Sequence, residues 1–136
     1  MHKISSECEN RFVKKSNPSK KGGCMAIINE KSNANKKFKT FINNHEHVIC
    51  LYHWLSCGFC LSFANVWNKV MNKYKDDINV ISIELEAIKH IDKKYQVSAF
   101  PTIVIFKNGV KEKEFTKART EKELIKFIEE NMIKEK

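Results

Sequence analysis

The sequence predicts an α/β fold in which a central mixed β-sheet is flanked by helices on both faces. Apolar runs rich in β-branched residues alternate with segments whose apolar residues recur every three or four positions, so strands and helices follow one another. An Asn-Gly pair between the last two predicted strands is typical of a tight antiparallel hairpin. The 136 residues can form one hydrophobic core but not two ordinary domains.

The chain divides near residue 24. Residues 1–24 carry six lysines or arginines against two glutamates, and residues 14–23 combine a proline, a glycine pair and charges, which is typical of a linker. We therefore expect a basic, flexible N-terminal tail over 1–24 and the folded domain over 25–136. Nearly half of the +9 net charge lies in this tail. Solvation of a flexible segment accounts for that charge more simply than nucleic-acid binding, so no nucleic-acid partner is expected.

The first half of the domain alternates strand and helix twice. A short strand is predicted at 24–30, and a helix follows at 32–44 with Ser32 or Asn33 as its N-cap. The run at 47–55 has no polar alternation, which indicates a strand buried on both faces. An amphipathic helix is predicted after it by apolar residues spaced by three and four, namely Phe63, Val66, Trp67, Val70, Met71 and Tyr74.

The second half begins with another apolar strand at 78–85 and a shorter helix at 87–97. Residues 102–116 contain two runs joined at Asn108-Gly109, which predicts the hairpin. Parallel crossovers therefore come first along the chain and an antiparallel pair comes last, as a mixed sheet requires.

The last element is an amphipathic helix. Thr120 and Glu123 have the spacing of a capping box at its start. Its apolar face is formed by Leu124, Phe127, Ile128 and Met132.

Two cysteines stand where a strand ends and a helix begins. Cys57 and Cys60, separated by Gly58 and Phe59, therefore lie at the carboxyl edge of the sheet, where sites form in α/β proteins. The free amide groups and dipole of the helix N-terminus favour a thiolate, so we predict a lowered pKa for Cys57. Cys60, one turn further into the helix, is predicted to be shielded and to resolve a mixed disulfide.

A structural zinc site and two inert core thiols are the alternative interpretations of this pair. A structural zinc site needs four ligands, usually from two close pairs. Cys8 and Cys24 lie in or beside the linker, and His45 and His47 lack the usual spacing, so we expect no metal and no cofactor. Two inert core thiols conflict with a position at the sheet edge. Five cysteines cannot all pair within one chain, and we expect Cys8 and Cys24 to be exposed.

The sequence resembles the thioredoxin superfamily over roughly residues 25–134. The resemblance rests on "SCGFC" after a strand, on "VSAFPTIVIFKNG" further along, and on the order of elements. It implies the thioredoxin fold, protein-disulfide oxidoreductase activity, and a cis proline at Pro101 that packs beside the two cysteines. It also implies that Phe100 and Pro101, together with Gly58 and Phe59, contact the substrate. A simple proline at the entry of a strand is the alternative for Pro101.

Two segments are more similar to protein disulfide isomerase domains than to thioredoxin proper. They are "AFPT" and "KARTEKEL". The second segment implies that Arg119 lies near the site and lowers the pKa of the second cysteine. A solvated side chain near a helix start is the alternative for Arg119.

The chain also departs from the family pattern. The acidic residue that the family buries six positions before the first cysteine is replaced by Leu51. The second cysteine therefore lacks an obvious internal base, unless water, His53 or Arg119 compensates. Ser56 replaces the usual tryptophan, and Asn65 replaces the usual proline of the following helix.

The expected function is that of a thiol-disulfide oxidoreductase. The Cys57 thiolate attacks a protein or peptide disulfide, a mixed disulfide forms beside Pro101, and Cys60 releases the product. A thiol reductase or oxidase is the expected partner. The alternative is a redox-weak binding or adaptor module with the same fold, which Leu51, Ser56 and Asn65 favour.

The expected location is intracellular, with no membrane partner. The chain has no apolar run of transmembrane length, and its first residues contain no apolar segment typical of a signal peptide. Many lysines, asparagines and isoleucines with only two arginines are typical of an AT-rich genome. Packaging in a virion is conceivable if the source is a large DNA virus.

Overall fold

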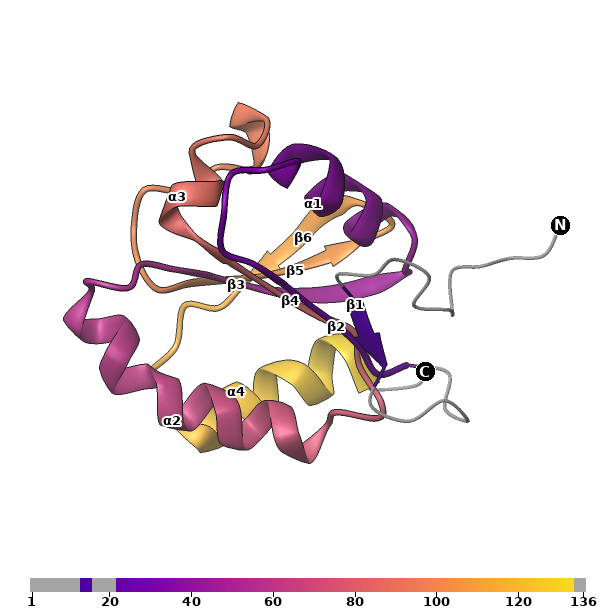
Figure 1. The fold of residues 1–136 in the computed structure, drawn as a ribbon. Helices are drawn as coiled ribbons and strands as arrows, with labels where there is room; N and C mark the ends of the chain where they lie inside the picture. Colours follow the sequence, from indigo (N-terminus) through magenta and orange to yellow (C-terminus); the bar gives the residue numbers. More distant parts are fainter. Residues whose placement is uncertain (1–12, 16–21, 134–136) are drawn as a thin grey trace, which may run out of the picture.

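The computed structural model describes residues 13–15 and 22–133. Its six-stranded sheet has the order β1-β2-β4-β3-β5-β6 (Figure 1). The strands are β1 (Val13–Lys15), β2 (Cys24–Ile28), β3 (His47–His53), β4 (Val80–Glu84), β5 (Thr102–Lys107) and β6 (Val110–Glu114). β2, β4 and β3 run parallel, whereas β1, β5 and β6 are antiparallel to their neighbours. The predicted mixed sheet is confirmed.

Helices cover both faces of this sheet, as predicted. They are α1 (Ala34–Asn43), α2 (Gly58–Lys73), α3 (Leu85–Ile88) and α4 (Glu121–Ile128), with short turns of other helical type at Lys93–Tyr95 and Glu129–Ile133. α1 and α3 lie on one face, and α2 and α4 on the other (Figure 1). The central strand β3 is buried on both faces: Cys50 joins the core under α1, and Leu51 joins the core under α2.

The N-terminal segment differs in part from the prediction. β1 lies inside the segment predicted to be a flexible tail and pairs with β2, so the sheet begins earlier in the chain than expected. The remainder of that tail, residues 1–12 and 16–21, lies outside the described residues, as does Cys8. Cys24 was predicted to be exposed, but it is 1% exposed and disulfide-bonded. It is buried because it opens β2 and packs into the core under α1.

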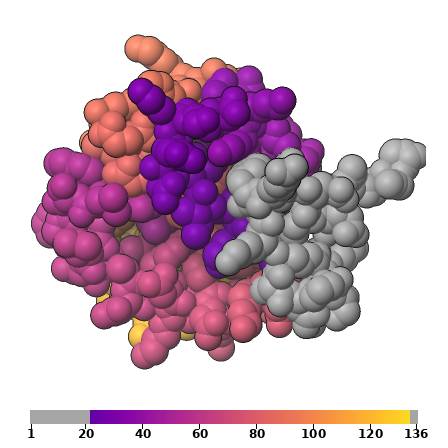
Figure 2. Space-filling model, viewed as in Figure 1, coloured from indigo at the N-terminus to yellow at the C-terminus, as the bar shows by residue number. Residues whose placement is uncertain are grey.

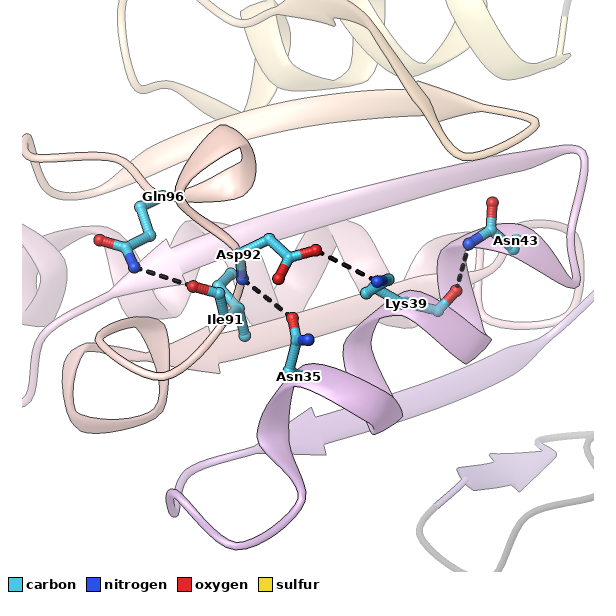
Figure 3. Close-up of polar contacts among 6 residues, drawn as sticks. All are labelled: Asn35, Lys39, Asn43, Ile91, Asp92 and Gln96. Atoms are coloured by element: carbon cyan, nitrogen blue, oxygen red, sulfur yellow. Dashed lines mark hydrogen bonds and ion pairs between the residues drawn. The ribbon is translucent and has the colours of Figure 1, made fainter.

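The helix predicted at 87–97 is replaced by α3 and a separate turn. α3 starts earlier because Glu84 caps it, accepting a hydrogen bond from the Glu86 N–H at 2.9 Å. The chain after α3 is then held by α1 (Figure 3). The Asp92 N–H donates to Asn35 Oδ1 at 2.9 Å, and the Asp92 carboxylate lies 3.1 Å from Lys39 Nζ. These contacts with α1 replace the regular bonds of one continuous helix.

The predicted hairpin and the last helix are present. β5 and β6 meet at Asn108 and Gly109, both with positive φ. At α4, Thr120 Oγ1 accepts a hydrogen bond from the Glu123 N–H at 3.2 Å. The Thr120 N–H donates to Ala118 O at 2.9 Å, so the start of α4 is fixed on both sides of Thr120. This fixes the position of Arg119.

No helix within the described residues is both long and apolar enough to cross a membrane.

Candidate active site

Cys57 stands between the end of β3 and the start of α2. The Cys57 N–H donates to Trp54 O at 3.0 Å, which closes the turn after β3. Cys57 is the N-cap of α2, with extended backbone, and its sulfur accepts a hydrogen bond from the Cys60 N–H at 3.1 Å. The sulfur thus takes the capping role that Ser, Thr, Asp and Asn side chains usually have. The local fold therefore places a thiol where the start of a helix needs a hydrogen-bond acceptor.

The two cysteines differ in acidity. Burial alone raises the pKa of Cys57, but hydrogen bonds from the Cys60 thiol and from the Cys60 and Phe59 N–H groups, together with the charge of Arg119, lower it below its ordinary value. The pKa of Cys60 is raised to about 11 by burial, by the hydrogen bond with Cys57 and by the Cys57 charge. A hydrogen bond with the Trp54 backbone and the charge of Arg119 lower this pKa, but by less. The lowered pKa agrees with the prediction for Cys57. Cys57 is therefore the more acidic thiol of the pair and loses its proton at a lower pH than Cys60.

The exposure of Cys60 differs from the prediction. Cys57 is 8% exposed and Cys60 is half-buried. Cys60 was expected to be shielded, but its side of α2 faces a cavity that keeps it accessible. The expected shielding of Cys60 is wrong because the sheet does not pack directly against α2 at this point, where the cavity lies between them.

The loop before β5 faces Cys57. The Phe100–Pro101 peptide bond is cis, and Phe100 O lies 3.6 Å from Cys57 Sγ. Thr102 Oγ1 donates to Ala99 O at 2.6 Å, which ties the loop across its base. Pro101 is buried and Phe100 is half-buried. The loop therefore brings a backbone carbonyl to the sulfur.

The residues between the cysteines face outward. Gly58 is exposed, and an added Cβ there meets no atom within 4 Å. Phe59 is 67% exposed, and Arg119 Cζ lies 5.5 Å from the centre of its ring. This cation–π contact joins the segment before α4 to the first turn of α2. The structure thus brings all seven predicted site residues to one end of the sheet.

One residue of this region was not foreseen. Glu84, at the end of β4, is only 4% exposed, and its carboxylate lies 3.4 Å from Leu55 N, where it accepts a hydrogen bond. It holds the turn between β3 and α2 as well as the start of α3. The sequence does show an acidic residue at the end of an apolar strand, and that strand is parallel to the one that leads to the cysteines. This pattern could have identified Glu84 as part of the site.

A cavity of about 620 Å³ opens beside Cys60 between the sheet and α2. Its lining is largely apolar and includes Ile27, Leu51, Trp67, Met71, Val80 and Pro101. His53 and Cys60 also line it. Figure 2 shows the side of the molecule on which the indigo segment with β2 and the magenta helix α2 reach the surface. Leu51 makes the floor of the site apolar.

The described residues contain no group of three His, Cys, Asp or Glu side chains placed to hold a metal ion. His45 is buried against the Phe41 ring, with ring centres 4.7 Å apart. His47 lies 3.8 Å from the carboxylate of Glu112.

The family model "Thioredoxin" matches residues 29–130, and the chain belongs to this family. Solved structures agree at the level of the fold. The oxidised thioredoxin of Plasmodium falciparum is similar over 77% of this chain and 97% of its own, with a TM-score of 0.62 and 20% identity. The J-Trx1 fragment of ERdj5 is similar over 76% of this chain and 50% of its own, with a TM-score of 0.66 and 16% identity.

Curated relatives include both thioredoxins and disulfide isomerases. Thioredoxin Y1, chloroplastic, from Arabidopsis thaliana is 34% identical over 91 residues, which is 67% of this chain and 53% of the relative. Protein disulfide isomerase-like 2-1 from Oryza sativa subsp. japonica is 38% identical over 77 residues, which is 54% of this chain and 21% of the relative. The chain thus spans about half of the first relative and a smaller part of the second.

Proposed function

We propose that the protein is a thiol-disulfide oxidoreductase that acts on protein or peptide disulfides through Cys57 and Cys60. The observation that carries this proposal is the pairing of a thiol of lowered pKa, at the N-terminus of α2, with a protonated thiol one turn away. Nucleophilic sulfur is the thiolate, so Cys57 reacts first. Membership of the thioredoxin family supports the same chemistry.

The reaction proceeds in two exchanges. The Cys57 thiolate attacks one sulfur of a substrate disulfide, forms a mixed disulfide, and releases the other substrate sulfur as a thiolate. Cys60 then loses its proton and attacks Cys57 Sγ. A Cys57–Cys60 disulfide forms and the second substrate thiolate leaves. The substrate gains two electrons that the dithiol loses, and a thiol reductase partner restores the dithiol. With an oxidase partner the same steps run in reverse.

A polypeptide suits the surface around the pair. Leu55, Phe59 and Leu61 lie within four residues of Cys57 in the sequence and expose apolar area, with exposed fractions of 67%, 67% and 65%. The loop with Phe100 and Pro101 offers backbone groups beside the same sulfur. We propose that an extended peptide lies along this loop with apolar side chains on the exposed residues.

The test is to measure disulfide reduction and oxidation with purified protein. Cys57→Ser abolishes both activities if the proposal holds, whereas the matched change Cys50→Ser, at a buried thiol under the opposite face, leaves them unchanged. Equilibration with glutathione buffers gives a reversible pair within roughly −270 to −180 mV, the range from thioredoxin to disulfide isomerase. Wild-type activity in Cys57→Ser would overturn the proposal.

A binding or adaptor module is the second candidate. The apolar cavity and the leucine at position 51 favour it, because they leave the second cysteine without a carboxylate beneath it. In that case a variant with both Cys57 and Cys60 changed to Ser retains partner binding and biological function in full. Loss of function in this double variant counts against the module.

A further inference from the structure

The second exchange requires Cys60 to give up a proton. In the dithiol, burial together with the hydrogen bond and charge of Cys57 raises the pKa of Cys60 to about 11, so only roughly one molecule in ten thousand carries the Cys60 thiolate at pH 7. The Cys57 charge is gone in the mixed disulfide, but burial, the largest of these causes, still disfavours the Cys60 thiolate there. A neighbouring proton acceptor therefore speeds resolution of the mixed disulfide. Leu51, which lies in the floor of the site, cannot serve.

The cavity beside Cys60 narrows the choice of acceptor. Apart from Cys60 itself, the titratable side chains among its described lining residues are Cys24, His53 and Lys75. Cys24 is disulfide-bonded and cannot titrate. Lys75 lies beyond the C-terminal end of α2, at the end opposite Cys60. His53 is therefore the lining residue that can accept a proton near pH 7.

The backbone places His53 close to the reacting sulfur. Leu51 and His53 are two residues apart on β3, so both side chains point to the α2 face, and His53 is the nearer of the two to the start of α2. Cys60 also contacts the backbone of Trp54, the residue that follows His53. His53 and Cys60 thus line one cavity from opposite walls, with room for a bridging water.

The surroundings of His53 suit a base that is neutral before the step and cationic after it. Burial lowers the pKa of His53, and the Glu84 carboxylate raises it by a smaller amount. Glu84 is the neighbour of His53 in the β3–β4 register and is buried. The other charged or titratable groups that face the cavity are Cys60 and Lys75. Cys60 lies in the first turn of α2, and Lys75 lies just beyond its C-terminal end. The cavity residues of β2, including the disulfide-bonded Cys24, and Pro101 just before β5 carry no charge.

We infer that His53 is the proton acceptor for Cys60 when the mixed disulfide is resolved, acting across the cavity with Glu84 stabilising the imidazolium. This inference rests on the proposed function. The Cys60 proton passes to the neutral imidazole directly or through one water, the Cys60 sulfur bonds to Cys57 Sγ, and the bond from Cys57 to the substrate sulfur breaks. The departing substrate thiolate, or solvent, then takes the proton from His53. Two electrons pass to the substrate sulfur, and no further reactant is needed.

The test separates the two exchanges. One equivalent of an aromatic disulfide, whose thiolate absorbs visible light, is mixed rapidly with the reduced protein. Its first thiolate reports attack by Cys57, and its second reports attack by Cys60. Cys60→Ser shows only the first phase and corrects for other thiols. His53→Gln leaves the first phase within about twofold and slows the second at pH 7 by at least about tenfold, since general bases contribute ~10²–10⁴.

Three further readouts distinguish proton transfer from a change of shape. In the wild type, the rate of the second phase levels off above the pKa of His53, whereas in His53→Gln it keeps rising with pH toward the pKa of Cys60. Added imidazole restores the second phase of His53→Gln and leaves the wild type unchanged. His47→Gln, on the same strand and face but at its far end, behaves as the wild type.

A second phase with wild-type rate and pH profile in His53→Gln overturns the inference and leaves the proposed function intact. So does a slowed second phase that imidazole does not restore. If the wild type itself forms no Cys57–Cys60 disulfide, the proposed function fails and this inference fails with it.

Discussion

Cys57 Sγ lies 3.1 Å from the backbone nitrogen of Cys60, so the more acidic thiol of the pair is also the cap of the helix that carries its partner. A free N–H at a helix start stabilises negative charge. The same hydrogen bond from the Cys60 N–H therefore lowers the pKa of Cys57 and caps the start of α2. This relationship leads to predictions about the thiols and about the residues that support them.

The two thiols should titrate separately. Alkylation of the reduced protein, followed by mass spectrometry across a pH series, is expected to modify Cys57 first, with a midpoint below the ordinary pKa of a thiol. Cys60 should follow only as the pH approaches about 11. In the Cys57→Ser variant the Cys60 midpoint should fall, because the Cys57 charge that raises the pKa of Cys60 is removed. Equal midpoints for the two cysteines would contradict the hydrogen-bond pattern at the start of α2.

The same shifts fix how the stability of the reduced protein depends on pH. The pKa of Cys60 is raised on folding, so the folded state retains its proton longer and this contribution to stability is lost as the pH rises toward about 11. The pKa of Cys57 is lowered, so its contribution is present above the unfolded pKa and is lost as the pH falls through the folded value. Urea unfolding of the reduced wild type, Cys57→Ser and Cys60→Ser at several pH values measures both effects. A Cys60→Ser variant with an unchanged alkaline slope would count against the assignment.

Arg119 should tune the pair through its charge. Arg119→Gln removes a positive charge that lowers the pKa of both cysteines, so their alkylation midpoints are expected to rise. Because Arg119 is exposed and its field is screened, the expected rise is small and shrinks in high salt. Arg119→Lys keeps the charge and is the matched control. Midpoints unmoved by Arg119→Gln at low salt would exclude this role.

Glu84 should stabilise the turn and the imidazole of His53. Glu84→Gln removes a buried charge that accepts from Leu55 N and Glu86 N, and we expect the free energy of unfolding to fall by about 1–2 kcal/mol. It also removes the charge that raises the pKa of His53, so the His53 titration seen by NMR should move to lower pH. The exposed neighbour change Glu86→Gln should do neither. If the His53 titration does not move in Glu84→Gln, the Glu84 charge does not stabilise the His53 imidazolium.

The cap of α4 should be measurable apart from the chemistry. Thr120→Ala removes the hydroxyl that accepts from the Glu123 N–H, so the free energy of unfolding should fall by about 1 kcal/mol. Thr116→Ala, at an exposed site in the preceding segment, is the matched control. Both are compared by urea unfolding at neutral pH. Equal stability of the two variants would show that the cap contributes nothing.

Local signals in the sequence were enough for much of the fold. The Asn108-Gly109 pair, the spacing from Thr120 to Glu123 and the period of α2 each depend on neighbouring residues, and each predicted its element. The break after α3 depends on a contact between Asp92 and Asn35, distant in sequence, and was not predictable from local periodicity.

The site shows the same division. The position of Cys57 follows from a strand that runs into a helix, which a sequence pattern reveals. The burial of Cys24 and the accessibility of Cys60 depend on how β2 packs against its neighbours and how α2 sits over the sheet. Glu84 becomes part of the site only because β4 lies beside β3. Such relations between strands need the three-dimensional arrangement.

Under the proposed function, the sulfur that caps α2 also links electron transfer to folding. A thiolate held by helix amides stabilises the dithiol form relative to the disulfide form, so part of the free energy of the native structure is available only while the protein is reduced. Each electron pair accepted strengthens the cap, and each pair donated weakens it. The reduction potential of the pair and the difference in unfolding free energy between the two redox states are thus two measurements of one thermodynamic cycle.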